Sequence, residues 1–165
     1  MKKELLSASC IKSLNKAIEY ELGHFYLYKL LANKMQGLGY FGAQKYFLAE
    51  SAEEEQHYQK HVDFLNDLGI VAKLPTLAPE KDEVTSLIDA IQIAYDNELD
   101  LLNYYRKLYS QEEEEYPEIA EHLNFYLKTQ REAVGFYGDM LVRLDLVKND
   151  SCGILIIDKE LKKLA

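Results

Sequence analysis

The sequence has few of the residues that interrupt regular secondary structure. Its 165 residues include only 3 prolines and 8 glycines, so long regular elements are expected. Valine and threonine are also sparse, whereas leucine, alanine, glutamate, lysine and tyrosine are plentiful, which favours helix over sheet. At this length we expect a single domain, residues 1–165, with a substantial buried core.

The chain has fewer basic than acidic residues. The chain has 28 acidic and 19 basic residues and a formal net charge of −9, so no basic patch is available to neutralise the phosphates of a nucleic acid. No window approaches the roughly 20 apolar residues of a membrane span. The start, Met1 to Cys10, has too short an apolar stretch for a signal peptide. We expect neither a nucleic acid nor a membrane as partner, and an acidic protein of this kind suits the attraction of cations.

Cysteine is scarce as well. Cys10 and Cys152 lie near opposite ends of the chain and do not have the spacing of a metal-binding cysteine motif. Two distant, isolated cysteines are typical of a reduced compartment, so we expect a cytoplasmic protein.

Four long stretches have the periodicity of amphipathic helices. They run from about 7 to 35, 41 to 68, 83 to 110 and 117 to 147, and a shorter amphipathic segment follows from about 154 to 164. The first and third connections are short, which makes the helices on either side of each antiparallel neighbours. The middle linker reaches at most about 46–50 Å when extended, whereas each long predicted helix is about 42 Å long. The linker can therefore just run the full length of the bundle. We therefore expect an all-α four-helix bundle with one long crossover and a short fifth helix.

Polar residues interrupt the apolar seam of each long helix. The interruptions are Glu21, Glu54 with His57, Glu98, and Gln130 in the fourth helix. The three glutamates lie near the midpoints of their helices, and midpoints meet at one level whichever way each helix runs. The sequence therefore predicts that these polar side chains converge inside the bundle.

Three glutamates in one buried site are unfavourable unless something compensates their charge. Burial of each charge costs several kcal/mol, so either some carboxyls are protonated or a cation lies among them. No lysine or arginine occupies these inward positions. Glu54 and His57 are three residues apart and project from one face of their helix, where both can bind one ion. Because carboxylate oxygens with an imidazole suit iron, manganese or zinc, we predict a metal site.

The remaining histidines have structural interpretations. His61 is either a partner of the site or a core residue, and we favour the core. His24 follows Glu21 at the same Glu-x-x-His spacing and is a candidate extra ligand, but it lies at the edge of the seam, so we interpret it as structural. We expect His122 at the surface. Tyr28 lies two turns from Glu21 on the same face, where it can contact the site.

The motifs around these residues resemble those of the non-haem bacterial ferritins over nearly the whole chain. They are LNKAIEYEL (14–22), AEEEQHYQKHVDFLNDLG (52–69), AYDNE (94–98), FYLKTQRE (125–132) and IDKEL (157–161). The resemblance implies the ferritin-like four-helix bundle and a cage of 24 identical subunits. Such a cage oxidises Fe(II) with oxygen or hydrogen peroxide and stores the ferric mineral. Bacterioferritins and rubrerythrins are less similar, because they carry a Glu-x-x-His or a similar pair on the fourth helix as well.

The resemblance also implies a di-iron centre with defined ligands. The first iron site of the family corresponds here to Glu21, Glu54 and His57. The second shares Glu54, adds Glu98, and has a further glutamate on the fourth helix. Two residues match family positions beside the centre: Gln130 and Tyr28.

The fourth helix departs from the family pattern. The glutamate expected three residues after Gln130 is Ala133, which cannot bind a metal, and Glu132 points about 100° away around the helix. The third iron site of the family is matched only in part, by Glu53 and Glu132. We therefore predict a complete first site, a weak second site and slow ferroxidase activity. The alternatives are a storage or structural cage subunit with impaired ferroxidase activity and, more remotely, a mononuclear metal sensor or buffer.

Overall fold

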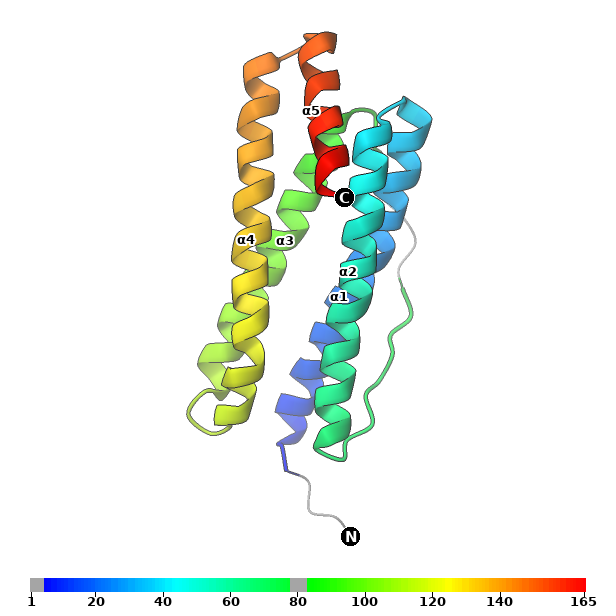
Figure 1. Ribbon diagram of the computed structural model, residues 1–165. Helices are drawn as coiled ribbons and strands as arrows, with labels where there is room; N and C mark the ends of the chain where they lie inside the picture. The colour runs from blue at the N-terminus through cyan, green and yellow to red at the C-terminus, as the bar shows by residue number, and fades with distance from the viewer. Residues whose placement is uncertain (1–4, 78–82) are drawn as a thin grey trace.

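The computed structural model describes residues 5–77 and 83–165, which form five helices (Figure 1). These are α1 (Ala8–Leu38), α2 (Phe41–Asp67), α3 (Leu87–Glu112), α4 (Pro117–Val147) and α5 (Ser151–Leu164). Part of the expected crossover, residues 78–82 with Pro79, lies outside the described residues, as do residues 1–4 of the segment considered as a signal peptide. None of the described helices is long and apolar enough to cross a membrane.

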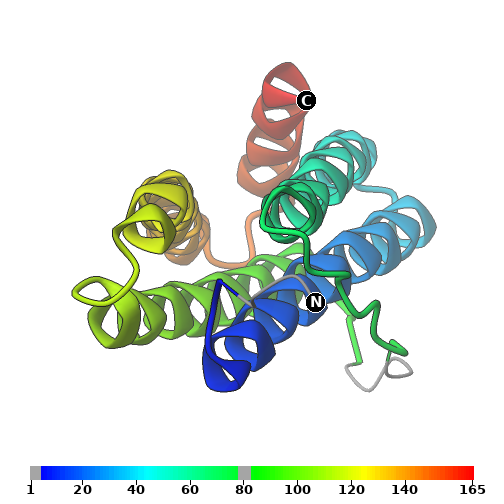
Figure 2. The same ribbon diagram turned by 90° about the horizontal axis from the view of Figure 1, so that it is seen from below.

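The topology is the predicted four-helix bundle with one long crossover. α1 packs antiparallel on α2, and α3 packs antiparallel on α4. The described start of the connection from α2 to α3, residues 68–77, runs along the outside of the bundle (Figure 1). Viewed along the bundle, the α1–α2 pair lies beside the α3–α4 pair, and α5 lies outside the four long helices (Figure 2).

Two helix ends differ from the predicted ones for local reasons. α1 continues to Leu38, where Gly39 adopts a left-handed conformation (φ 85°) that ends the helix. α3 begins at Leu87 rather than near residue 83. The Ser86 hydroxyl accepts a hydrogen bond of 3.1 Å from the Asp89 N–H and thereby caps the first turn.

The short helix α5 holds the start of α2 in place. It begins at Ser151, three residues before the predicted start, because the Asp150 carboxylate accepts hydrogen bonds from the first amides of the helix. Further along, the buried Asp158 carboxylate accepts hydrogen bonds from the N–H groups of Gly42 (3.0 Å) and Ala43 (2.7 Å). Asp158 therefore caps α2 from another helix. A Cβ at Gly42 would lie 1.8 Å from the Asp158 carbonyl oxygen, so the contact requires glycine.

A layer of polar side chains divides the interior into two apolar clusters. One cluster lies toward α5 and includes Tyr28, Phe47, Ile91, Tyr137 and Ile157. The other lies toward the opposite end and includes Leu14, Ile18, Leu65, Tyr105 and Leu123. In each long helix, the polar residue of the seam lies between residues of one cluster and residues of the other. The four polar residues are Glu21, Glu54, Glu98 and Gln130. The core is therefore apolar at both ends and polar in its middle layer.

Candidate metal centre

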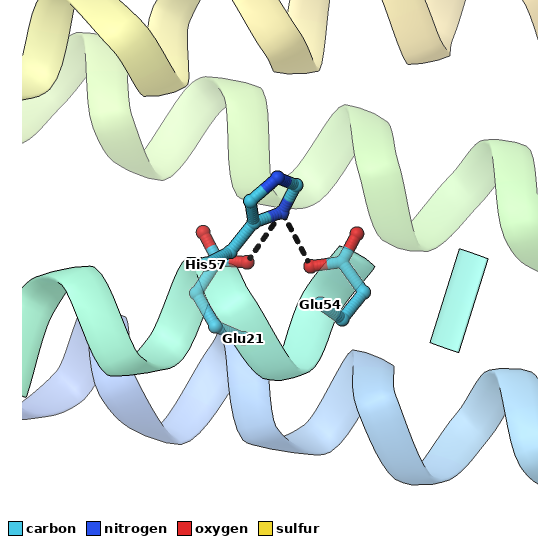
Figure 3. A group of neighbouring side chains, drawn as sticks. All are labelled: Glu21, Glu54 and His57. Atoms are coloured by element: carbon cyan, nitrogen blue, oxygen red, sulfur yellow. Dashed lines mark hydrogen bonds and ion pairs between the residues drawn. The ribbon is translucent and has the colours of Figure 1, made fainter. Parts of the chain in front are cut away.

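α1 and α2 together supply a first group of possible metal ligands. Glu21, Glu54 and His57 each offer one ligand atom, and these atoms lie within 4.8 Å of one another. His57 Nδ1 lies 3.0 Å from Glu54 Oε2 and 3.7 Å from Glu21 Oε2 (Figure 3). All three side chains are buried. The Glu54-x-x-His57 spacing therefore presents both side chains to a carboxylate of the neighbouring helix.

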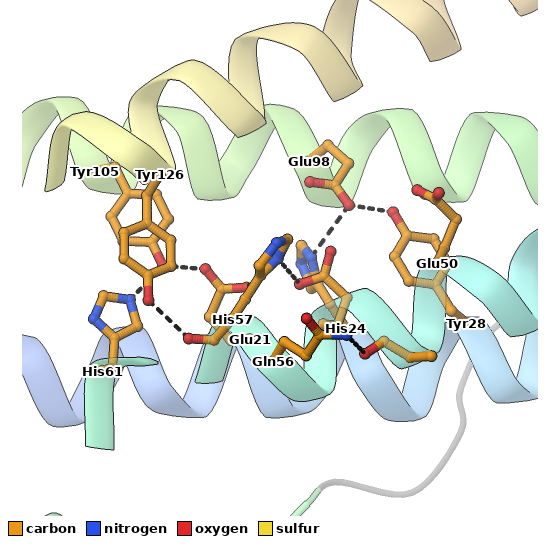
Figure 4. Close-up of polar contacts among 12 residues, drawn as sticks. Glu21, His24, Tyr28, Glu50, Gln56, His57, His61, Glu98, Tyr105 and Tyr126 are labelled. Atoms are coloured by element: carbon orange, nitrogen blue, oxygen red, sulfur yellow. Dashed lines mark hydrogen bonds and ion pairs between the residues drawn. The ribbon is translucent and has the colours of Figure 1, made fainter. Parts of the chain in front are cut away.

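A second group of possible ligands lies beside the first. It consists of His24, Glu54 and Glu98, whose ligand atoms also lie within 4.8 Å of one another. His24 Nδ1 lies 3.4 Å from Glu98 Oε1, which also accepts a hydrogen bond from the Tyr28 hydroxyl (Figure 4). Glu54 belongs to both groups, so a single carboxylate lies between two places where an ion can be bound.

The structure changes the position assigned to His24. From the sequence we expected His24 at the edge of the seam, whereas the buried face of α1 runs through Glu21, His24 and Tyr28. Phe25 is only partly buried. Because α1 packs against both α2 and α3, its buried face is wider than one seam. The repeated Glu-x-x-His spacing was the sequence signal that pointed to His24.

Glu50 is a further carboxylate near the centre, and it was not among the predicted site residues. It lies one turn before Glu54 on α2, and its Oε2 accepts a hydrogen bond of 3.3 Å from the Tyr137 hydroxyl. Burial, together with repulsion from Glu53 and Glu98, raises the pKa of Glu50 to about 7.

Burial strongly shifts the pKa values of the ionisable side chains in the centre. Burial raises the pKa of Glu21 well above its usual range, and repulsion from Glu54 adds to the effect. Burial and the charge of Glu98 raise the pKa of Glu54 in the same way. For His24, burial lowers the pKa, but the neighbouring carboxylates, with Glu98 foremost, together outweigh it, so the net shift of the pKa is upward. The metal-free centre therefore retains protons that a bound cation would displace.

Several buried polar atoms of the centre lack hydrogen-bond partners within residues 5–77 and 83–165. They are Glu21 Oε2, His24 Nδ1, Glu98 Oε2 and both amide atoms of Gln130. Buried polar atoms in proteins are almost always paired, so such a concentration at one place calls for an explanation. Carboxylate oxygens and an imidazole nitrogen are suitable ligands for iron, and a bound ion would satisfy the first three atoms. The residues present therefore fit a metal ion.

α4 faces the centre with the neutral side chain of Gln130. The Tyr126 hydroxyl donates a hydrogen bond of 2.7 Å to the His57 carbonyl oxygen, and Tyr137 contacts Glu50. Gln130 lies between these two tyrosines on the same face of α4 and is fully buried. Ala133, one turn further along this face, packs against the apolar cluster toward α5.

The two acids expected to contribute weakly are outside the centre. Glu53 on α2 and Glu132 on α4 are both exposed, and neither belongs to the two ligand groups found among the described residues. Their assignment to a third iron site stays a prediction.

A chain of hydrogen bonds runs from the first ligand group to His122 near the surface of the bundle, and Figure 4 shows its part from Glu21 through Tyr105 to His61. Tyr105 donates its hydroxyl hydrogen to Glu21 Oε1. Its oxygen lies 2.8 Å from His61 Nε2, and His61 Nδ1 lies 2.9 Å from His122 Nε2. His61 is thus a core residue, as favoured, but one linked to the site. His122 is only partly buried and lines a surface pocket; burial and the charge of Lys60 lower its pKa to about 4.

Comparisons with known proteins agree with this architecture. A profile of the ferritin-like domain matches residues 11–147. The chain is 27% identical over 163 residues to a probable bacterial non-heme ferritin-like protein of Haemophilus influenzae, covering 98% of both chains. It is 23% identical over 159 residues to a bacterial non-heme ferritin of Staphylococcus aureus, covering 95% of each.

The fold is also similar to a solved ferritin. The open pore ferritin of the hyperthermophilic archaeon Archaeoglobus fulgidus superimposes with a TM-score of 0.88 at 26% identity, covering 95% of this chain and 98% of that one. The chain belongs to the ferritin-like family.

Proposed function

We propose that the chain binds Fe(II) in the middle layer of its bundle, oxidises it, and stores the ferric product in a cage built from copies of itself. The observation that carries this proposal is the position of Glu54, which belongs both to the group with Glu21 and His57 and to the group with Glu98. One carboxylate between two ligand groups is the arrangement required to hold two ions side by side.

Two neighbouring iron ions suit the reaction chemically. Each Fe(II) loses one electron, so a pair reduces one molecule of hydrogen peroxide to two of water with the uptake of two protons, or one oxygen to peroxide. The protein fixes the positions of the ions and supplies hard carboxylate ligands that stabilise the higher charge of Fe(III). Glu21 and Glu54 supply ligand oxygens, and the protons they release on binding iron become available to the reduced oxidant.

A second candidate function is a storage or structural subunit with impaired ferroxidase activity. It is favoured by Ala133, which stands on the inward face of α4 where the related proteins are expected to have a glutamate. In this case iron would enter the cage and oxidise slowly as mineral grows. A mononuclear metal sensor or buffer is the third candidate, and it would bind one ion per subunit rather than two.

Assembly into a cage is supported by apolar side chains that remain exposed near the end of α4 and on α5. These are Val142, Leu146, Leu155, Ile156 and Leu164. Clusters of exposed large apolar residues are typical of protein interfaces. We propose a homo-oligomer, of 24 subunits by the family resemblance, located in the cytoplasm.

Stopped-flow mixing of the iron-free protein with Fe(II) and oxygen or hydrogen peroxide distinguishes the candidates. Rapid oxidation of two Fe(II) per subunit supports the ferroxidase, whereas oxidation no faster than that of Fe(II) in buffer supports the storage subunit. Ala133→Glu restores a carboxylate on α4, and we expect it to accelerate the reaction. An unchanged rate in Ala133→Glu would remove the missing acid as the cause of slow oxidation.

A further inference from the structure

We propose that His24 is a ligand of the second iron site, where its imidazole takes the place of the carboxylate that α4 lacks. This inference rests on the proposed function, since it assigns a residue to the same centre. It also changes the character of that site. A second site with Glu54, Glu98 and His24 has three protein ligands, as the first site has, rather than two.

The geometry of His24 is that of a ligand rather than of a hydrogen-bonding core residue. Its Nδ1 is buried and lies 3.4 Å from Glu98 Oε1, yet it makes no hydrogen bond within the described part of the chain. Two ligands that bind one ion at about 2.1 Å lie about 3.0–3.4 Å apart, depending on the angle between them. The separation of 3.4 Å between His24 Nδ1 and Glu98 Oε1 falls within this range.

The surroundings of Glu98 favour the same interpretation. Its Oε1 already accepts a hydrogen bond from Tyr28, and its Oε2 has no hydrogen-bond partner among the described residues. If His24 were present only to stabilise Glu98, one of these oxygens would be expected to accept a well-aligned hydrogen bond from it. Instead, His24 Nδ1 faces Glu98 Oε1 at 3.4 Å without forming a hydrogen bond, and Glu98 Oε2 has no hydrogen-bond partner among the described residues (Figure 4).

The two antiparallel helices carry the same ligand pattern. Glu21-x-x-His24 on α1 faces Glu54-x-x-His57 on α2, and each histidine meets a carboxylate of another helix. His57 serves the group that contains Glu21, and His24 serves the group that contains Glu98. Each ion would therefore have one imidazole. His24 on α1 thus compensates for the carboxylate that is missing at Ala133 on α4. From α4 itself, Gln130 presents only a neutral amide.

Titration of the iron-free, assembled protein with Fe(II) under anaerobic conditions tests this assignment. The wild type should bind two ions per subunit, and His24→Ala should bind one, with the affinity of the second site reduced by about 100-fold or more. His24→Ala/Ala133→Glu supplies the acid from the opposite helix and should bind two ions again. His57→Ala should lose the other ion, which shows that the two histidines serve different sites.

His24→Phe keeps the aromatic volume beside Tyr28, so it provides the same test if His24→Ala does not assemble. Anomalous diffraction from crystals of each variant soaked anaerobically in Fe(II) locates the ion that is lost. If His24→Ala or His24→Phe still binds two ions with wild-type affinity, the inference is wrong and the proposed function stands. If the wild type binds no Fe(II), the proposed function itself fails.

Discussion

His57 Nδ1 lies 3.0 Å from Glu54 Oε2, one turn away on the same helix, which is hydrogen-bonding distance. Both residues belong to the group whose ligand atoms would surround an ion. Metal ions and protons therefore compete for the same atoms, which makes the affinity for metal dependent on pH.

Metal binding is expected to release protons near neutral pH. The pKa values of Glu21 and Glu54 are both raised by burial, so part of their protonated form persists well above the usual range of a carboxyl group. An ion must displace these protons, and its affinity should rise about tenfold per pH unit for each proton released. Calorimetric titration with zinc, a redox-inactive probe, in two buffers of different ionisation enthalpy measures the release directly. An equal binding enthalpy in both buffers would show that no proton is displaced.

The stability of the metal-free protein should depend on Glu50. Its pKa is raised in the folded state from 4.5 to about 7, so its favourable contribution is fully present below about pH 4.5 and is lost as the pH rises through 7. In Glu50→Gln the free energy of unfolding should fall less between pH 5 and 8, by about 2 kcal/mol. Chemical denaturation at a series of pH values measures this difference. Glu55→Gln changes an exposed carboxyl of α2 that does not contribute to the raised pKa of Glu50, so it should follow the wild-type curve. Identical curves for all three proteins would contradict the prediction.

Tyr105 is expected to position Glu21. It donates a hydrogen bond to Glu21 and accepts one from His61, so Tyr105→Phe leaves a buried carboxylate and an imidazole each short of a partner. We expect a loss of about 1–3 kcal/mol in stability and a weaker first site. Tyr104→Phe is the matched control, because it removes a hydrogen bond to the Ser13 carbonyl oxygen away from the centre. Thermal unfolding and zinc titration should separate the two variants; equal zinc affinities would argue against a positioning role.

The exposed apolar surface of α5 should be needed for assembly. Leu155 and Ile156 are more than half exposed in the single chain. Leu155→Glu/Ile156→Glu places two charges in the proposed interface and should yield smaller particles that keep their helical content. Analytical ultracentrifugation measures the mass and circular dichroism the helicity. A variant that assembles like the wild type would place the interface elsewhere on the subunit.

The fold could be predicted from the sequence because its determinants are local. The apolar seams and the short first and third connections specify two pairs of antiparallel helices, and the length of the middle linker permits the crossover. The starts of α3 and α5 were misplaced, because hydrophobic periodicity alone does not show which of several nearby polar residues caps a helix. Ser86 and Asp150 do so through side-chain hydrogen bonds.

The centre could be predicted in part. Glu21, Glu54 and Glu98 converge because each interrupts a seam near the midpoint of a helix. His24 could not be placed from its own helix, since a residue about 60° from the centre of the seam is buried or exposed according to how many helices pack around it. α1 contacts both α2 and α3, and this tertiary arrangement brings His24 against Glu98.

The most direct test of the centre is the anomalous scattering of iron in crystals of the wild-type protein soaked anaerobically in Fe(II). Two peaks per subunit are expected, one beside Glu21 and His57 and one beside Glu98, with Glu54 between them. No peak in the middle layer of the bundle, or peaks only at exposed acids such as Glu53 and Glu132, would contradict an iron centre built on Glu54.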